Sequence, residues 1–501
     1  MKRRSFLAAG GAVTAATAVG GYTLPAATTA PDWSALRAGL DGDVLLPGHE
    51  YYEDARVLFS QQFDRVRPRA VVMCARPEDV RESILFARHH GIHCVPRSGR
   101  HSFGGYSTTD GMVIDTSRLH RVAVEEGLAR IGPGARVIDL HEGLLPHGLT
   151  VPSGWCPTVG MGGLTLGGGF GLESRAHGLT IDRLDAVQLT LADGTSIRCD
   201  AHHHPDLFWA LRGGGGGNFG IVTSFTFRPV RVTPHMFSYS LAWPLGRAVQ
   251  VLDAWQHWAP SAPNTMTPLV TLRRGAVQGR PALEVYGSWT GSRGGLDQVL
   301  ERLVDTVGVA PEDSQVREQP YRAAMMSWFG CEEFAPRECR VTGQSPDGRI
   351  PRFGPSGTRG ALFRHSVPRT GLRHVVDAFR DGECAQHETR EMNLMAMGGA
   401  TAQVHPAATA YVHRSSAFSL GVTYALDTST SREERRRARR WVDASWQRLW
   451  PWSSRHAYQN FIDPRLPNWR RAYYGDNYTR LSAVRRRYDP EGFFRFPQAI
   501  T

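Results

Sequence analysis

Apolar and polar residues alternate along the first part of the chain as they do in strands and helices that follow one another. Apolar runs at 70–74 and 112–115 predict buried strands. Between them, Pro77 and two acidic residues open a helix that keeps helical apolar spacing as far as Gly91. Residues 92–96 predict the next strand, so the chain opens in the order β-α-β. This order indicates an α/β or α+β domain.

Shorter elements follow over residues 128–228. We expect strands at 128–131, 186–191, 195–199 and 221–228, and helices at 137–145 and 205–211. Asp193-Gly194 predicts a hairpin turn between two of these strands. Beyond residue 231 glycine becomes rarer, and strand-like runs at 236–242, 282–289 and 418–425 alternate with helices. That part predicts a second α/β layer, which could form a roof over a substrate.

The stretch 153–171 departs from both patterns. Eight of the eighteen residues from Gly154 to Gly171 are glycine, too many for a stable helix or a packed strand. Glycine lets a backbone approach a ligand, and bare amide N–H groups suit an anion. The alternative is a flexible linker, but linkers are polar, whereas this stretch contains Trp155, Val159 and Phe170. We expect a binding loop, with Cys156 at its mouth.

A second candidate loop follows the strand at 92–96. Its sequence, RSGRHSFGG at 97–105, combines arginine charge, serine hydroxyls and glycine. Charged donors and free backbone amides at a tight bend suit a pyrophosphate group.

The chain has 501 residues and a formal net charge of +11. Its arginines are scattered, and the densest run, at 432–440, predicts a solvated helix face rather than a nucleic-acid surface. Residues 1–30 combine Arg3-Arg4, a short apolar run and small residues, as twin-arginine export signals do. We therefore expect an exported protein, with no stable membrane insertion once this signal is removed.

Neither cysteine nor histidine spacing predicts a metal site. The seven cysteines include no C-x-x-C pair. Cys331 and Cys339 are candidates for a disulfide bond outside the cell. The run 202–204 consists of three histidines, but no acidic or cysteine partner lies at ligand spacing.

Several of these motifs together resemble one family. The RSGRHS loop, the Cys156 loop, the sequence GLTID at 178–182, the block 206–220 and the tail 473–500 are similar to the berberine-bridge-enzyme-like group of the vanillyl-alcohol-oxidase superfamily. The resemblance implies an α+β fold. A two-subdomain FAD-binding domain at 31–230 would precede a substrate domain at 231–455, whose antiparallel sheet covers the flavin, and residues 456–501 would return to the FAD domain.

The resemblance also implies that FAD is attached twice, through His101 to the flavin 8α carbon and through Cys156 to C6. From the residues alone, His101 could instead be a phosphate-loop donor and Cys156 a free buried thiol. Val159 matches a position near flavin C4a where a small aliphatic residue lets O2 approach. The residues that we expect to bind the cofactor are His101, Cys156, Arg97, Ser98, Gly99, Arg100, Ser102, Val159, Gly160, Gly162, Gly163, Gly168, Gly171, Gly220, Ile221, Tyr474 and Asn477.

The catalytic base is where the chain departs from the family pattern. Many relatives have a tyrosine base where this chain has Phe461, which cannot take a proton. Tyr458 lies three residues earlier, an offset that points to the opposite face if the segment is a strand. Only a bulge or a helical turn would bring it back. Tyr411, Tyr473 and Glu391 are the further candidates.

These features predict a secreted flavoprotein oxidase. Its partners would be O2, which yields H2O2, and a small hydroxyl- or amine-bearing molecule, either a secondary metabolite or a carbohydrate. Two alternatives stay open. One is a flavoprotein that binds or reoxidises a drug, which the missing hydroxyl at Phe461 favours. The other is a basic protein that binds polyanions.

Overall fold

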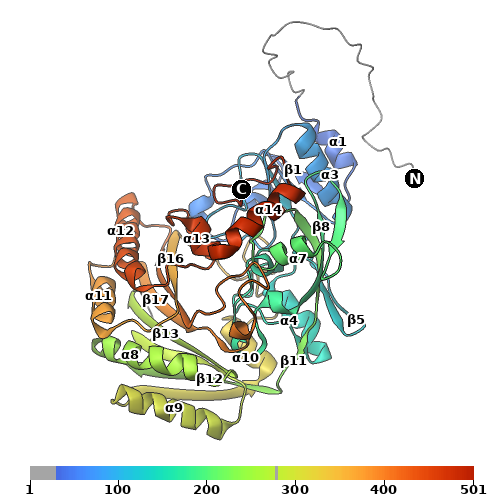
Figure 1. Ribbon diagram of the computed structural model, residues 1–501. Helices are drawn as coiled ribbons and strands as arrows, with labels where there is room; N and C mark the ends of the chain where they lie inside the picture. Colours follow the sequence, from blue (N-terminus) through green and yellow to red (C-terminus); the bar gives the residue numbers. More distant parts are fainter. Residues whose placement is uncertain (1–29, 277–279) are drawn as a thin grey trace, which may run out of the picture.

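The computed structural model describes residues 30–276 and 280–501, and three sheets organise them (Figure 1). The predicted export signal falls on residues 1–29, outside the described part. Among the described residues, no helix is both long and apolar enough to cross a bilayer. The mixed α+β class predicted from the sequence is confirmed.

The first sheet has four strands in the order β1-β2-β4-β3, with β2 and β3 both parallel to the central β4. Its strands are β1 (Asp43–Leu45), β2 (Ala70–Met73), β3 (Cys94–Arg97) and β4 (Met112–Asp115), and its helices are α1 (Trp33–Ala38), α2 (Tyr52–Arg56) and α3 (Pro77–His89). Helix α3 begins at Pro77, as the proline and the acids of its first turn predict.

The second sheet has five antiparallel strands in the order β5-β6-β10-β8-β9. They are β5 (Val122–Glu125), β6 (Leu128–Ile131), β8 (Leu184–Thr190), β9 (Ser196–Cys199) and β10 (Ile221–Phe227). A short ribbon joins β7 (Leu149–Thr150) to β11 (Val230–Arg231), and the helices here are α4 (Val137–Leu144), α5 (Met161–Leu166), α6 (Ser174–His177) and α7 (Pro205–Leu211).

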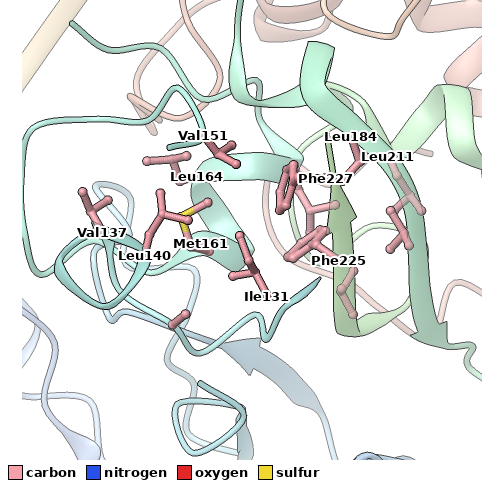
Figure 2. Close-up of a cluster of buried hydrophobic side chains, with 14 of the residues drawn as sticks. Ile131, Val137, Leu140, Val151, Met161, Leu164, Leu184, Leu211, Phe225 and Phe227 are labelled. Atoms are coloured by element: carbon pink, nitrogen blue, oxygen red, sulfur yellow. The ribbon is translucent and has the colours of Figure 1, made fainter. Parts of the chain in front are cut away.

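Helix α5 corrects the sequence prediction, because it forms inside the glycine-rich stretch. Gly162 and Gly163 each cost about 1 kcal/mol in a helix. Burying Met161, Leu164 and Leu166 gains about 1.5–3 kcal/mol for each side chain, so burial outweighs the propensity. Figure 2 shows Met161 and Leu164 among apolar side chains of α4, β6 and β10.

The third sheet is wholly antiparallel, with the strand order β15-β12-β14-β13-β17-β18-β16. Its strands are β12 (His235–Trp243), β13 (Met266–Gly275), β14 (Leu283–Trp289), β15 (Asp313–Pro320), β16 (Ser356–Phe363), β17 (Glu388–Ala396) and β18 (Phe418–Leu426). Burial alternates along β18, so one face is packed and the other is half-open.

Four helices cover the packed face of the large sheet (Figure 1). They are α8 (Ala248–Trp258), α9 (Arg293–Val307), α11 (Arg369–Arg380) and α12 (Arg432–Leu449). Helix α10 (Tyr321–Trp328) instead packs its apolar residues into the core of the second sheet. A disulfide joins Cys331 to Cys339 just beyond α10.

Buried arginines tie the large sheet to the rest of the molecule. The Arg175 guanidinium of α6 donates to three backbone carbonyl oxygens, those of Ala262, Met266 and Met397. Arg414 binds both oxygens of Asp182 at 2.7 Å. The planar guanidinium forms such paired bonds in fixed geometry, so these contacts set the position of the sheet above the glycine-rich loop.

The C-terminal segment packs against the first half of the chain. It contains α13 (Trp469–Tyr474) and α14 (Tyr478–Tyr488), and α14 lies beside α7 in Figure 1. The backbone N–H of Ile500 donates to Asn218 Oδ1 at 2.9 Å, and the Tyr474 hydroxyl donates to the Gly214 carbonyl at 3.1 Å. The end of the chain therefore holds the glycine run that precedes β10.

Between the first two sheets, the loop after β3 packs against the loop before α5, and the contact is made by one glycine from each loop, Gly99 and Gly160. A β-carbon on Gly160 would lie 2.1 Å from Ser98 Oγ and 2.3 Å from the Gly99 nitrogen, and one on Gly99 would lie 2.0 Å from the Gly160 nitrogen. Only glycine fits at either position. The loop after β3 and the loop before α5 are therefore in direct backbone contact.

Gly160→Ala should force these loops apart and lower the free energy of unfolding by about 2–3 kcal/mol, as overpacking does. The matched control is Gly246→Ala, because an added β-carbon there meets open space. Thermal unfolding followed by circular dichroism measures both variants. Equal melting temperatures for the two would contradict the contact.

Candidate functional site

A cavity lies between the first sheet, the glycine-rich loop and the C-terminal segment. Thirteen of the residues expected to bind the cofactor are among those that line it. They are Arg97, Ser98, Gly99, Arg100, His101, Ser102, Val159, Gly160, Gly162, Gly163, Gly220, Ile221 and Tyr474.

The loop after β3 presents a row of backbone amides at this cavity. Among the described residues, the N–H groups of residues 99–103 have no hydrogen-bond acceptor. Arg100 has φ +64°, a left-handed conformation of the kind that forms anion-binding nests of successive amides, and we call residues 99–103 the amide nest. On the facing wall, a β-carbon on Gly163 would meet open space. Free amides opposite a bare glycine wall fit the pyrophosphate and ribityl parts of FAD.

The two arginines of this loop do not add charge to the nest, which corrects the sequence prediction. The Arg97 Nε lies 2.7 Å from Asp115 Oδ2, and both side chains are fully buried. Arg97 also donates to the carbonyl oxygens of Ala55 and Arg56. Arg100 donates to the Asp54 carbonyl at 2.7 Å, and burial together with Arg97 lowers its pKa to about 9. The two arginine side chains therefore stabilise the conformation of the loop through these buried contacts and do not present their charge to the nest.

The serines of the loop are also used internally. Ser98 Oγ donates to the Pro133 carbonyl at 2.6 Å, and Ser102 Oγ accepts the Tyr106 N–H at 2.9 Å. The sequence predicts that these two hydroxyls face the pyrophosphate, but in the structure they form hydrogen bonds that stabilise the turn.

The side chains of His101 and Cys156 both contact the hydroxyl oxygen of Thr158. Thr158 Oγ1 lies 2.7 Å from His101 Nε2 and 3.6 Å from Cys156 Sγ. The imidazole also stacks on Phe59, with ring centroids 4.5 Å apart and planes 15° apart. The sequence reading missed Thr158, although it is one of few polar residues in the glycine-rich stretch. Two residues predicted as attachment points from separate loops are thus neighbours.

The environments of the two groups differ. Burial, and secondarily the charge of Arg136, lowers the pKa of His101 to about 3, so the imidazole is neutral at working pH. Burial raises the pKa of the Cys156 thiol, whereas hydrogen bonds from the Thr158 side chain and nearby backbone N–H groups lower it in part. The imidazole has a lone pair available as a nucleophile, and the thiol needs help to ionise.

Other predicted cofactor residues lie away from the cavity wall. Asn477 Nδ2 donates to the carbonyl oxygens of Pro406 and Thr409, at 3.0 and 3.1 Å. Gly168 packs beneath the rings of Tyr411 and Tyr458, and Gly171 touches the Ser153 carbonyl. These residues shape the loops and are not among those that line the cavity, so their contact with the cofactor stays a prediction.

The cavity also has walls that the sequence reading did not assign. They come from the glycine run before β10 and from the last residues of the chain, which meet only in the folded molecule. These residues are Gly215, Gly216, Gly217, Asn218, Gln459, Asn460, Phe494 and Phe496.

Tyr458 and Phe461 do not lie on a strand. The N–H of Phe461 donates to the Tyr458 carbonyl at 3.0 Å, which closes a turn, and the two rings touch with centroids 5.2 Å apart. The strand assumption was wrong, because this turn brings both rings to the same side.

Among the four candidate bases, Tyr458 has the surroundings that best suit a phenolate. Its hydroxyl oxygen accepts from the Gly169 N–H at 3.0 Å and from Asn460 Nδ2 at 2.9 Å. Burial raises the pKa of Tyr458 to about 12, and these two donors act against that rise. No acceptor for its own hydrogen is found among the described residues.

The other candidates have different surroundings. The Tyr411 hydroxyl is buried and has no partner within the described chain. The Tyr473 hydroxyl accepts the Asp463 N–H at 2.8 Å. Glu391 lies on β17, 3.3 Å from Arg273 Nε. None of the three oxygens is held by two donors as that of Tyr458 is.

The histidine run on the surface gathers no metal ligands. His203 Nδ1 lies 3.0 Å from Asp200, and no group of three potential ligands is found within residues 30–276 and 280–501.

Family models match two parts of the chain. The model described as "FAD binding domain" matches residues 68–200, and "Berberine and berberine like" matches residues 457–501. These segments contribute the amide nest, the His101–Cys156 pair and the C-terminal wall. The chain is 31% identical over 468 residues to the FAD-linked oxidoreductase YgaK of Bacillus subtilis, covering 92% of this chain and 97% of that protein.

Solved structures share the fold. BBE-like 1 of Physcomitrella patens superposes with a TM-score of 0.83 at 24% identity, covering 93% of this chain and 98% of that one. Glucooligosaccharide oxidase of Acremonium strictum, described as carrying 6-S-cysteinyl, 8α-N1-histidyl FAD, has a TM-score of 0.80 at 24% identity and the same coverage.

Removing either partner of the Arg97–Asp115 pair should unfold the amide nest. Arg97→Ala and Asp115→Ala should each lower the free energy of unfolding by about 3–5 kcal/mol, because each leaves a buried charge unpaired. The double variant should lose less than the sum of the two, as coupled residues do. Denaturant titration of all three measures this.

The control for this cycle is Arg293→Ala, which breaks an exposed pair with Asp297 on α9. It should change stability by less than about 1 kcal/mol. Normal stability in Arg97→Ala, together with loss of FAD, would instead place Arg97 at the pyrophosphate.

Proposed function

This chain belongs to the berberine-bridge-type family of FAD-linked oxidoreductases, and from that premise we propose that it is an oxidase whose FAD is bonded to both His101 and Cys156. The observation that carries the proposal is the meeting of these two nucleophiles at Thr158, beside the amide nest. Two bonds would retain the cofactor outside the cell. They would also leave one side of the ring open to a bulky substrate.

The residues around the cavity divide the work. FAD, when bound, accepts a hydride from a substrate C–H bond and passes two electrons to O2. The amides of residues 99–103 hold the pyrophosphate. Val159 lines the cavity and would keep that wall small, which supports access of O2. Tyr458 takes the proton of the substrate hydroxyl or amine, and Gly169 and Asn460 stabilise the oxygen that must first lose its own proton.

The substrate is a hydroxyl- or amine-bearing secondary metabolite or carbohydrate. Two surfaces support the proposal that the substrate has both apolar and polar parts, one being aromatic and the other charged. Phe461 is 42% exposed and lies against Phe103, with ring centroids 5.3 Å apart. The half-open face of the large sheet bears Arg273, which pairs with Glu284 at 2.6 Å and Glu391 at 3.3 Å.

The protein acts after export. The twin-arginine pattern at residues 3–4 belongs to a pathway that carries proteins already folded, which suits a chain loaded with its cofactor. The Cys331–Cys339 disulfide supports an oxidising compartment, because such bonds seldom persist in the cytosol.

Single replacement of either attachment residue should leave the flavin bound by the other. We expect wild type, His101→Ala and Cys156→Ala to keep flavin fluorescence on a denaturing gel, and the double variant to lose it. Cys199→Ala, which removes a buried thiol elsewhere, is the control and should match wild type. Complete loss of flavin from one single variant would contradict double attachment.

Tyr458→Phe should slow turnover by about 10²–10⁴-fold without releasing flavin, because a general base contributes that much. In wild type, activity should rise with pH as Tyr458 ionises, and the variant should lose that rise. Peroxide release from panels of sugars and aromatic alcohols provides the assay.

The control for the hydroxyl is Tyr239→Phe, since the buried Tyr239 oxygen has no partner in the described chain. An unaltered pH profile in Tyr458→Phe would exclude Tyr458 as the base. Peroxide production from an already reduced drug alone would favour the drug-reoxidising alternative.

A further inference from the structure

We infer that Thr158 is a positioning residue that prepares both nucleophiles for attachment to FAD through its single hydroxyl group. The inference rests on the proposed attachment through His101 and Cys156. It assigns a role to a third residue that makes no bond to the ring.

The hydrogen-bonding capacity of a hydroxyl limits what Thr158 can do. It has one hydrogen to donate and two lone pairs to accept with. The residue is almost wholly buried, and its Oγ1 lies 2.7 Å from His101 Nε2 and 3.6 Å from Cys156 Sγ. Whatever the hydroxyl does for one neighbour therefore constrains what it does for the other.

The reactive form of His101 fixes the direction of both bonds. A neutral imidazole carries its proton on one nitrogen only, and a nitrogen that attacks carbon must be the other one. Nε2 faces Thr158, whereas Nδ1 has no partner among the described residues. With the proton on Nε2 donated to Thr158 Oγ1, the Nδ1 lone pair is available to form the bond.

The same arrangement directs the Thr158 hydrogen toward Cys156. Because Oγ1 accepts from Nε2, its own O–H is free to donate to the sulfur. A hydrogen bond to sulfur favours the thiolate over the thiol, and it opposes the effect of burial. One hydroxyl thus selects the imidazole tautomer and assists ionisation of the thiol.

Phe59 completes the placement of the imidazole. Its ring is stacked on that of His101 at 4.5 Å. Stacking fixes the ring plane, and the Thr158 bond fixes the rotation within that plane. Together the stacking and the hydrogen bond fix the direction in which the Nδ1 lone pair points.

The atoms and electrons of each attachment reaction balance when O2 is the oxidant. One bond forms, from nitrogen to the 8α-methyl carbon or from sulfur to the ring carbon C6, and one C–H bond of that same carbon breaks. The imidazole loses its Nε2 proton and the thiol loses its own proton, and each proton is released to solvent. Two protons and two electrons in all reach O2, giving one H2O2 for each bond formed.

The test compares Thr158→Val, which keeps the shape and removes the hydroxyl, with Thr158→Ser, which keeps the hydroxyl. Each variant is purified as the FAD-containing full chain, and the fraction of flavin that survives acid denaturation is followed over time. We expect attachment about tenfold or more slower in Thr158→Val, the effect of losing a hydrogen bond to a charged or reacting group. Thr158→Ser should restore most of the rate.

A matched control separates the hydroxyl from the loop. Thr165 is buried in α5 of the same stretch, and its hydroxyl has no partner in the described chain. Thr165→Val should attach flavin at the wild-type rate. Equal slowing in both valine variants would overturn the inference, because the effect would then come from the loop.

The pH dependence gives a signature that a merely structural role would not produce. Without the Thr158 hydrogen bond the thiol ionises only at higher pH, so attachment in Thr158→Val should accelerate more steeply than in wild type as the pH is raised. Wild-type rates at both residues in Thr158→Val, found by peptide mass mapping, would also overturn the inference. Absence of covalent flavin from wild type would instead refute the proposed function.

Discussion

The site depends on one close backbone contact, that between Gly99 and Gly160. A side chain at either position would overlap the opposite loop by more than an ångström. The contact joins a loop that follows a strand of the first sheet to a loop that starts a helix under the second. It brings the free amides of residues 99–103 and the imidazole of His101 to one cavity, and the thiol of Cys156 lies behind that imidazole at Thr158. The proposed attachment of flavin therefore depends on glycine at both positions, since only glycine leaves room for the opposite loop.

The remaining walls of the cavity come from distant parts of the sequence, the glycine run before β10 and the end of the chain, and buried polar contacts hold the parts of the molecule together. Arg175 and Arg414 fix the large sheet above the glycine-rich loop, and Asn218 binds the end of the chain through Ile500. Arg97 is buried with Asp115 behind the nest. The site needs positive charge to hold its shape, while the groups that line it are largely neutral amides, hydroxyls and aromatic rings.

Local pattern in the sequence predicted much of the fold, because helix starts, strand runs and turns are local. The bounds of α7 and β4 agree with the apolar runs from which they were predicted. Helix α5 was missed because burial of Met161 and Leu164 outweighs two glycines. The turn at Tyr458 was missed because an irregular segment follows no periodicity. Which acid neutralises Arg97, and which hydroxyl joins His101 to Cys156, are decided by tertiary contact alone.

The most direct test of the account is peptide mapping of the wild-type protein after proteolysis. The account predicts one flavin that joins two peptides, one containing His101 and the other Cys156. A flavin bonded to a single peptide, or to neither of these residues, would contradict it.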